Sequence, residues 1–238
     1  MMLLPVMHGY IDRRILVNFT TEPEIVSHLL PSIFRPKLYK DRAIVGICLI
    51  RFKHLKPKGF PDFLGISSEN GAHRIAVEWE EGGMTKQGVY IPRRDTAQRF
   101  NAIAGGRLFP GKHYLAKFNV AEGSGNYHID FTSSDNTSIS IDCQTTNNFP
   151  VNSIFGTLEN ASAFFETGSI GYSPNGEKHE GLELQTYKWQ VKSLEVSKVH
   201  SSFYENETIF PKGSIQFDNA LLMTHIEHEW KQVKDKAV

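Results

Sequence analysis

The sequence has few of the features that mark exported, membrane-spanning or nucleic-acid-binding proteins. Its 238 residues include only two cysteines, Cys48 and Cys143, so a disulfide framework is absent and a reducing compartment is favoured. Lysine plus arginine and aspartate plus glutamate are balanced at 26 each, so no bulk charge indicates a nucleic acid or an anionic membrane. No apolar run approaches the ~20 residues that cross a bilayer. We therefore expect a cytoplasmic protein with no membrane or nucleic-acid partner.

Familiar catalytic and metal-binding motifs are also missing. The stretch Gly106–Lys112 has the glycine and lysine spacing of a phosphate-binding loop, but that motif needs a strand before it, a helix after it and Ser or Thr next. Here His113 stands in the place of the hydroxyl residue. His225 and His228 lack the spacing of a zinc-binding motif and a third ligand, so we expect no metal. Neither cysteine has the local signature of a nucleophile, and we expect no cofactor.

What the chain does contain favours a mainly β protein of the α+β class. It is 40% hydrophobic and carries 16 Phe and 8 Tyr among many turn residues, a composition typical of strands. Its length suits one large β-rich domain as well as two small ones. Apolar alternation predicts strands at residues 11–18, 43–52, 72–79, 87–92, 114–120, 127–132, 137–143 and 186–196.

Helix and loop signals are fewer. Capping and proline patterns predict helices at Thr21–Leu30 and Asp95–Ala104, with Asp95 as the N-cap of the second, and a third helix is indicated around Thr157–Phe165. Polar composition predicts loops at residues 53–61 and 172–181. The tail 218–230 stays open between helix and strand, because its apolar residues recur at helical spacing while β-propensity is middling.

The densest polar chemistry lies in the stretch Gly105–Tyr114. Arg107, Lys112, His113 and Tyr114 fall within eight residues that also hold glycines and a proline, which define a turn between predicted helix and strand. We expect this corner to form the wall of a pocket. A desolvated lysine beside other cations becomes nucleophilic near neutral pH. The alternative for Lys112 is an ordinary exposed lysine.

The order of these elements resembles the acetoacetate decarboxylase-like superfamily, and most closely its uncharacterised bacterial YqjF-like relatives, a domain of unknown function. The matching features are the strand with Arg13, the helix ending in Leu29-Leu30-Pro31, Ser68-Glu69-Asn70, Gly88-Val89-Tyr90-Ile91-Pro92, Gly106-Arg107, Leu115-Ala116-Lys117-Phe118 and the tail to Trp230. The resemblance implies one domain over residues 1–238. It further implies a closed, strongly curved β-barrel with a few peripheral helices and a pocket inside.

The resemblance also implies site residues. In the decarboxylases the pocket holds a Schiff-base lysine, a glutamate and an arginine that meets the substrate carboxylate. Carried across, the arginine falls at Arg13 within one residue, and the glutamate falls at Glu69. The register of the following strand puts His113 or Tyr114 at the position of the reactive lysine, with Lys112 one or two residues early.

We therefore expect a pocket for a small organic anion, a keto- or hydroxy-acid-like carboxylate. Arg13, Arg107 and Tyr114 would bind the anion, while Glu69 and His113 would be available for proton transfer. Two alternatives stay open. One is a Schiff-base decarboxylase or aldolase-like lyase that acts on a keto acid through Lys112. The other is a non-catalytic ligand sensor or structural protein, which could be a homo-oligomer, whose charges form a buried ion-pair network.

Overall fold

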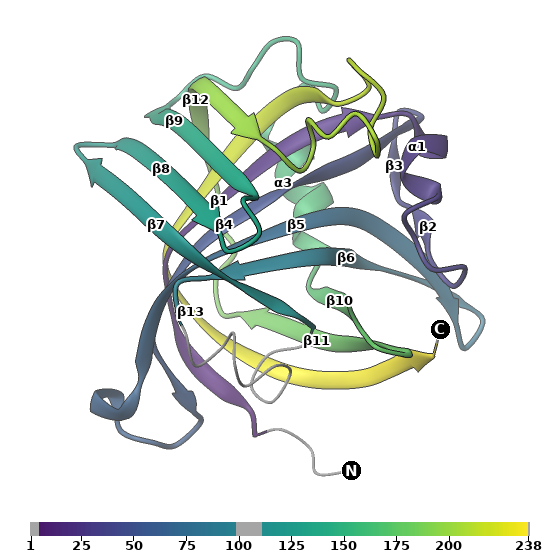
Figure 1. The fold of residues 1–238 in the computed structure, drawn as a ribbon. Helices are drawn as coiled ribbons and strands as arrows, with labels where there is room; N and C mark the ends of the chain where they lie inside the picture. The colour runs from purple at the N-terminus through teal and green to yellow at the C-terminus, as the bar shows by residue number, and fades with distance from the viewer. Residues whose placement is uncertain (1–4, 99–110, 238) are drawn as a thin grey trace.

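A computed structural model describes residues 5–98 and 111–237 as a mainly β fold (Figure 1). The strands are β1 Met7–Thr21, β2 Arg35–Pro36, β3 Leu38–Tyr39, β4 Arg42–Pro57, β5 Ile66–Glu81, β6 Met84–Thr96, β7 His113–Gly123, β8 Asn126–Ser133, β9 Ser138–Thr146, β10 Ile170–Asn175, β11 Lys178–Thr186, β12 Lys192–Ser201 and β13 Gln216–Ala237. The helical segments are α1 Pro23–Ser27, the 3-10 helix η1 Asp62–Leu64 and α3 Leu158–Glu166. Within the described residues, no helix has the length and apolar character needed to cross a bilayer.

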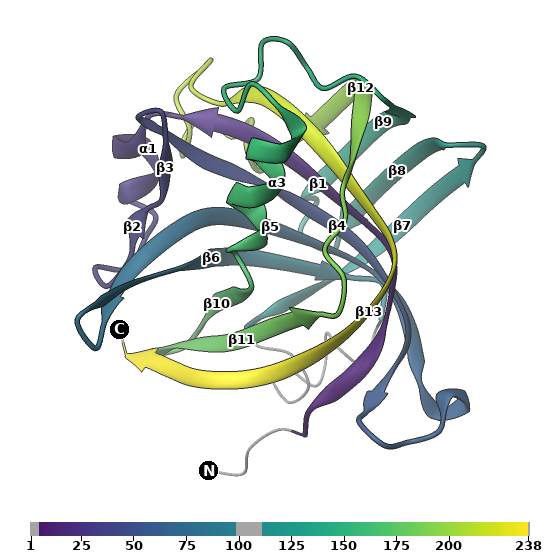
Figure 2. The ribbon, with the colours of Figure 1, turned by 180° about the vertical axis from the view of Figure 1, so that it is seen from behind.

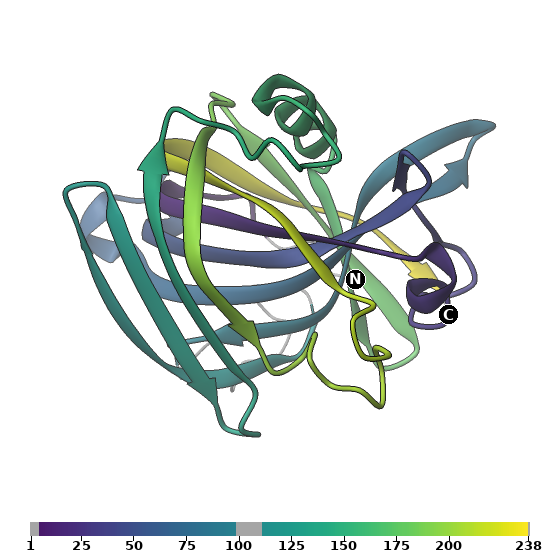
Figure 3. The same cartoon turned by 90° about the horizontal axis from the view of Figure 1, so that it is seen from above.

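The strands follow one hydrogen-bonded path, β11-β10-β6-β7-β8-β9-β12-β13-β1-β4-β5-β2, with β3 paired to β4. Two further pairings, β11 with β13 and β5 with β6, join distant parts of this path. The strands β13-β1-β4-β5-β6 are therefore shared by two circuits of pairing. One circuit returns through β10 and β11, and the other returns through β7, β8, β9 and β12. Figure 3, the view from above, shows how strongly the shared strands curve.

The shared strands are buried on both faces. Successive side chains of a strand point to opposite sides, so neighbouring residues of one strand pack into different apolar clusters. On β1, Ile15 and Val17 belong to one apolar cluster together with Phe131 of β8. Leu16, which lies between them, belongs to a second cluster with Phe165 of α3. Figure 2 shows α3 lying against the shared strands when the molecule is seen from behind. One set of strands thus separates two cores, and neighbouring residues of β1 face different surroundings.

Most of the predicted strands are present, and the structure extends nearly all of them. The continuously apolar run at residues 43–52 lies inside β4, where almost every position is buried. The hairpin predicted at 127–143 is formed by β8 and β9. The helix indicated around Thr157 is α3, and the Thr157 side chain caps it by accepting a hydrogen bond from Asn160 N. The strand predicted at 186–196 is displaced, since β11 ends at Thr186 and β12 begins at Lys192.

Strand pairing outweighs local signals in several segments, and it also decides the tail, which the sequence left open between helix and strand. Residues 172–181, predicted to be a loop, form most of the β10–β11 hairpin. Residues 53–57 continue β4 instead of starting a loop, and the tail is the long strand β13, paired with β1, β11 and β12. The helix expected at Thr21–Leu30 is only α1, and Glu22, not Thr21, is its N-cap.

The helix predicted at Asp95–Ala104 does not begin at Asp95. Asp95 and Thr96 are the last residues of β6 and pair with β5 and β7. Asp95 is fully buried, and its carboxylate accepts hydrogen bonds from Arg93 and Ser133 instead of capping a helix. Residues 99–110, which include Arg107 and most of the glycine-rich corner, lie outside the described residues.

Candidate functional site

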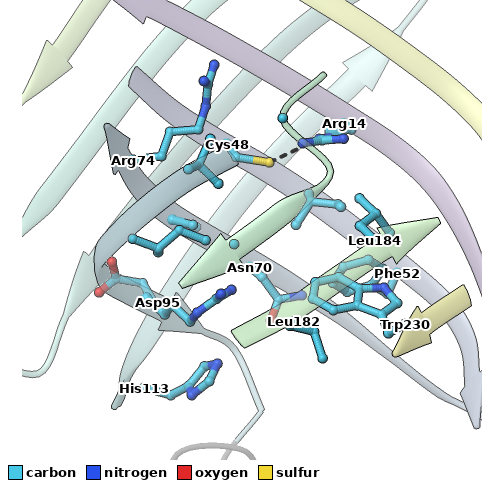
Figure 4. A pocket seen from close by; sticks show the side chains of 18 of the residues that line it. Arg14, Cys48, Phe52, Asn70, Arg74, Asp95, His113, Leu182, Leu184 and Trp230 are labelled. Carbon is cyan, nitrogen blue, oxygen red and sulfur yellow. Dashed lines mark hydrogen bonds between the residues drawn. The ribbon is translucent and has the colours of Figure 1, made fainter. Parts of the chain in front are cut away.

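A pocket of about 90 Å³ lies between the shared strands and the β10–β11 hairpin (Figure 4). Its described lining comes from β1, β4, β5, β6, β7, β10, β11 and β13 and from the segment after α3. The lining residues are Arg14, Cys48, Ile50, Phe52, Asn70, Gly71, Ala72, Arg74, Val89, Ile91, Arg94, Asp95, His113, Gly168, Ser169, Gly171, Leu182, Leu184 and Trp230. The surface of the pocket is mainly apolar and is interrupted by a few charged groups.

Three of these charged groups are the guanidinium groups of Arg14, Arg74 and Arg94, which come from β1, β5 and β6. Arg74 and Arg94 are only 4% and 8% exposed. Their hydrogen-bond partners among the described residues are all uncharged. Arg14 Nε lies 3.4 Å from Cys48 Sγ, Arg94 Nε lies 2.9 Å from Ser173 Oγ, and Arg74 donates to Asn18 Oδ1. Among the described residues, no carboxylate lies within ion-pair distance of any of the three.

Burial without a counter-ion makes these arginines unusual. Desolvation lowers the pKa of Arg74 to about 10 and lowers the pKa of Arg94 to about 10. The Nε of Arg74 is buried and has no hydrogen-bond partner in the part of the chain that the structure describes. Uncompensated buried charge costs free energy, and a nearby anion would offset that cost. The pocket is therefore electrostatically suited to an anion.

The carboxylate of Asp95, the only acidic residue in the described lining, does not neutralise these cations. It accepts hydrogen bonds from Arg93, at 2.7 Å from Nη2, and from the Ser133 hydroxyl. Arg93 in turn makes two hydrogen bonds to Asp135, at 2.6 and 2.8 Å. Figure 4 shows the Asp95 carboxylate at the edge of the group of side chains, on the side away from Trp230. Asp95 thus belongs to a separate ion-pair cluster that borders the pocket.

His113 is the predicted site residue that lines this pocket. It is the first residue of β7 and pairs in register with Arg94 of β6. Its Nδ1 lies 3.2 Å from the carbonyl oxygen of Gly111. Burial and the Arg94 guanidinium lower the pKa of His113 to about 4, so its imidazole is neutral at pH 7. A neutral imidazole can accept a proton from a bound ligand and can donate or accept a hydrogen bond.

Arg13 and Glu69 come together, but not in this pocket. Arg13 donates to Glu69 Oε2 at 2.6 Å and to Glu122 Oε2 at 2.7 Å, and Arg51 joins both glutamates. The four side chains form an ion-pair network between β1, β4, β5 and β7. Arg14 and Asn70, one residue further along each strand, line the pocket instead. The network has the form that the structural alternative predicts for these charges.

Lys112 and Tyr114 face a neighbouring groove. Lys112 is exposed, and its Nζ lies 4.8 Å from the centre of the Tyr114 ring. Both residues line this groove with Ser173, and neither lines the pocket that holds His113. The Tyr114 ring also stacks on the guanidinium of Arg93, 4.0 Å away. Alternation along β7 explains the separation, because His113 points to the side opposite its two neighbours.

The sequence-based prediction did not assign Arg14, Arg74, Arg94 or Cys48 to the pocket. A signal was available for one of them: Arg74 is a charged residue within the buried stretch of β5. A charged residue in such a strand must face a partner or a cavity. Choosing between Arg13 and Arg14 needed the register of β1, which a sequence does not contain.

Among the described residues, no group of three or more potential ligands is arranged to hold a metal ion.

Comparisons with known proteins agree with the fold. The model of the DUF2071 family, described as an uncharacterized conserved protein (COG2071), matches residues 11–222. A comparison with curated proteins finds no match. Among solved structures, an acetoacetate decarboxylase-like enzyme from Sphingomonas wittichii RW1 is similar, with a TM-score of 0.60 and 9% identity, over 97% of this chain and 94% of that one.

Two further structures share the fold. The acetoacetate decarboxylase of Legionella pneumophila has a TM-score of 0.55 and 14% identity, over 97% of this chain and 88% of that one. The enduracididine biosynthesis enzyme MppR, in a structure complexed with pyruvate, has a TM-score of 0.56 and 8% identity, over 100% of this chain and 91% of that one. At such low identity these similarities define the fold, which is that of the acetoacetate decarboxylase-like proteins.

Proposed function

Because the chain belongs to the DUF2071 family, whose description assigns no activity, we propose its function from the pocket: binding of a small organic anion, a keto- or hydroxy-acid-like carboxylate. The observation that carries the proposal is the set of three guanidinium groups, those of Arg14, Arg74 and Arg94, whose hydrogen bonds go only to uncharged partners. A carboxylate between them would supply the missing counter-charge.

The size and surface of the pocket support an organic anion over an inorganic one. At about 90 Å³, the pocket is smaller than the ~150 Å³ cavity that accepts benzene, so it suits a ligand of a few heavy atoms. Its walls include Ile50, Ile91 and Leu182. These apolar side chains can pack against the carbon atoms of a ligand, but they offer no hydrogen bonds to a hydrated inorganic ion. A carboxylate with a short carbon chain satisfies both the cations and these walls.

The shared fold supports keto acids as the first compounds to test, since the similar protein MppR has a structure complexed with pyruvate. We further infer that the circuit β13-β1-β4-β5-β6-β10-β11 closes into a barrel around the pocket, because its pairings return to the strand where they began. Such enclosure would exclude water and strengthen each ligand–arginine contact.

The proposed role does not depend on an imine. A Schiff-base lyase needs an amine inside the pocket, and Lys112 faces the neighbouring groove. No lysine is among the described lining residues, and residues 1–4, 99–110 and 238 contain none. Borohydride reduction in the presence of pyruvate or acetoacetate, followed by peptide mapping, is therefore expected to leave no adduct on Lys112. A reduced adduct there would favour the lyase alternative instead.

The experiment that tests binding is a thermal-unfolding series with pyruvate, acetoacetate, lactate and, for comparison, phosphate and sulfate. A ligand that binds only the folded state stabilises it by about 2.7 kcal/mol at a concentration a hundred times its Kd. We expect a saturable rise in melting temperature with the organic acids. The rise should be lost in Arg94→Gln and kept in Arg35→Gln, which changes an arginine that is 52% exposed on the surface. Equal shifts in all three proteins, or none with any acid, would contradict the proposal.

A further inference from the structure

Cys48 brings a nucleophilic atom into the pocket. It lies on β4 between two residues that face the other way, and it is 8% exposed, with its remaining exposure in the pocket lining. Its Sγ accepts a hydrogen bond from Arg14 Nε at 3.4 Å, the contact drawn in Figure 4. No local motif marked this cysteine, because the groups that surround it come from other strands.

The surroundings of the Cys48 sulfur are cationic. The Cys48 side chain lines the same pocket as the guanidinium groups of Arg14, Arg74 and Arg94. A thiol reacts as its thiolate, and cationic neighbours stabilise that anion. A second, independent feature points to a missing ligand in the same pocket: Arg74, which is 96% buried, has an Nε atom with no hydrogen-bond partner among residues 5–98 and 111–237. The cations that would hold a carboxylate therefore line the pocket that the sulfur faces, and one of them, Arg14, contacts the sulfur.

Cys143, the other cysteine, has the opposite surroundings. It lies on β9 and belongs to the apolar cluster that contains Ile15, Val17 and Phe131. It does not line the pocket. Burial and the neighbouring Asp142 raise the pKa of the Cys143 thiol to about 12. The chain thus carries an internal control for cysteine reactivity.

We propose that Cys48 is a nucleophile for small α-oxo carboxylates held by the pocket arginines, which makes it a site of reversible covalent capture. This inference rests on the proposed anion-binding function. The thiolate sulfur forms a bond to the carbonyl carbon, and the π electrons of the carbonyl move to its oxygen. That oxygen takes up a proton equivalent to the one that the thiol released, so the product is a thiohemiacetal or a thiohemiketal. No atom is oxidised or reduced, and no group leaves.

The first test uses two alkylating probes that differ in charge, iodoacetate and iodoacetamide. In either reaction the sulfur displaces iodide, which leaves with its bonding electrons, and the thiol proton goes to water. Rates at each cysteine are measured by peptide mass spectrometry in the folded and the unfolded chain. Cationic clefts raise the local concentration and capture rate of anions by ~10- to 1,000-fold. We expect folding to raise the iodoacetate-to-iodoacetamide rate ratio at Cys48 at least about tenfold, and Arg14→Gln to remove most of that rise.

The second test detects the adduct itself. Carbon-13 NMR of the protein with glyoxylate labelled at its aldehyde carbon should show a protein-bound thiohemiacetal signal, absent from both Cys48→Ser and Cys48→Ala and kept in Cys143→Ala.

An unreactive Cys48 in the folded chain, or a rate ratio that folding does not raise, would overturn the inference. If pyruvate still raises the melting temperature in that case, the anion-binding function stands alone. If no carboxylate stabilises the protein and Cys48 shows no preference, both fail together.

Discussion

Arg13 and Arg14 are consecutive residues of β1, yet their guanidinium groups lie on opposite faces of the same sheet. Arg13 is paired with Glu69 and Glu122 in an ion-pair network, and it is only 2% exposed. Arg14 faces the pocket, where its Nε donates a hydrogen bond to the sulfur of Cys48. Strand alternation thus places one of two adjacent, chemically identical side chains in an ion-pair network and the other in the pocket lining.

Replacing Arg13 is expected to lower stability and to leave ligand binding in place. Arg13→Met would leave Glu69 and Glu122 with Arg51 as their remaining cation, and it would leave partly buried carboxylate oxygens without a donor. Removing one partner of a buried ion pair costs about 3 kcal/mol. The measurement is the free energy of unfolding in urea, followed by the melting-temperature shift with pyruvate. A stable Arg13→Met protein that no longer responds to pyruvate would contradict this assignment.

The same substitution one residue later is expected to have the opposite effect. Arg14→Met removes a charge that has no carboxylate partner among the described residues and that lowers the pKa of Arg74 by repulsion. The ligand-free protein should therefore be as stable as the wild type or more stable by about 1 kcal/mol. The stabilisation by pyruvate should disappear. Urea unfolding with and without pyruvate gives both quantities, and a large loss of stability without ligand would argue against an unpaired charge.

How far the sequence predicts this fold can be argued from particular residues. Alternation and continuous apolar runs located most strands, and Thr157 correctly indicated α3. The tail was open to a helix because Leu222 and Ile226 are four residues apart, a spacing that shares a face in a helix and also in a regular strand. In β13 the two pack into different clusters, because His225, at φ 54°, interrupts the alternation between them.

The site was predictable in its chemistry but not in its register. Arg13, Glu69 and His113 were each expected at a pocket. The structure places Arg14 and Asn70 there in place of Arg13 and Glu69. A shift of one residue exchanges the two faces of a strand, and only the pairing with neighbouring strands decides which face is which. That pairing joins segments more than a hundred residues apart, such as β1 and β13, so no local pattern records it.

The hydroxyl of Tyr204 links two shared strands, and removing it is expected to destabilise the fold. It accepts a hydrogen bond from Gly46 N at 3.0 Å, and it lies 2.8 Å from Gly46 O and 3.0 Å from Arg74 O, to either of which it can donate. Tyr204→Phe leaves buried backbone groups without this partner, at a cost of about 2 kcal/mol. Urea unfolding should show that loss, whereas Tyr10→Phe, at a tyrosine that is 37% exposed, should change stability little.

The buried histidine His73 is expected to make the protein sensitive to acid. Its side chain is fully buried, its Nε2 lies 3.3 Å from Ser201 Oγ, and its ring packs 4.5 Å from the Phe203 ring. Burial, together with the Arg93 charge, lowers the pKa of His73 to about 3. Asp95, 4.0 Å away, gives little compensation because its carboxylate is already held by Arg93. The imidazole is therefore neutral in the folded state over most of the acidic range.

The sign of the pH effect follows from this depressed pKa. The unfolded chain binds a proton at His73 below about pH 6.5, whereas the folded chain does so only near pH 3. The contribution to stability is therefore complete above pH 6.5 and is lost as the pH falls towards 3, at up to about 1.4 kcal/mol per pH unit. Urea unfolding between pH 7 and 4 should show a shallower slope for His73→Gln than for the wild type. The same substitution at His225, which is 82% exposed, should leave the slope unchanged, and equal slopes in all three proteins would contradict a neutral buried imidazole.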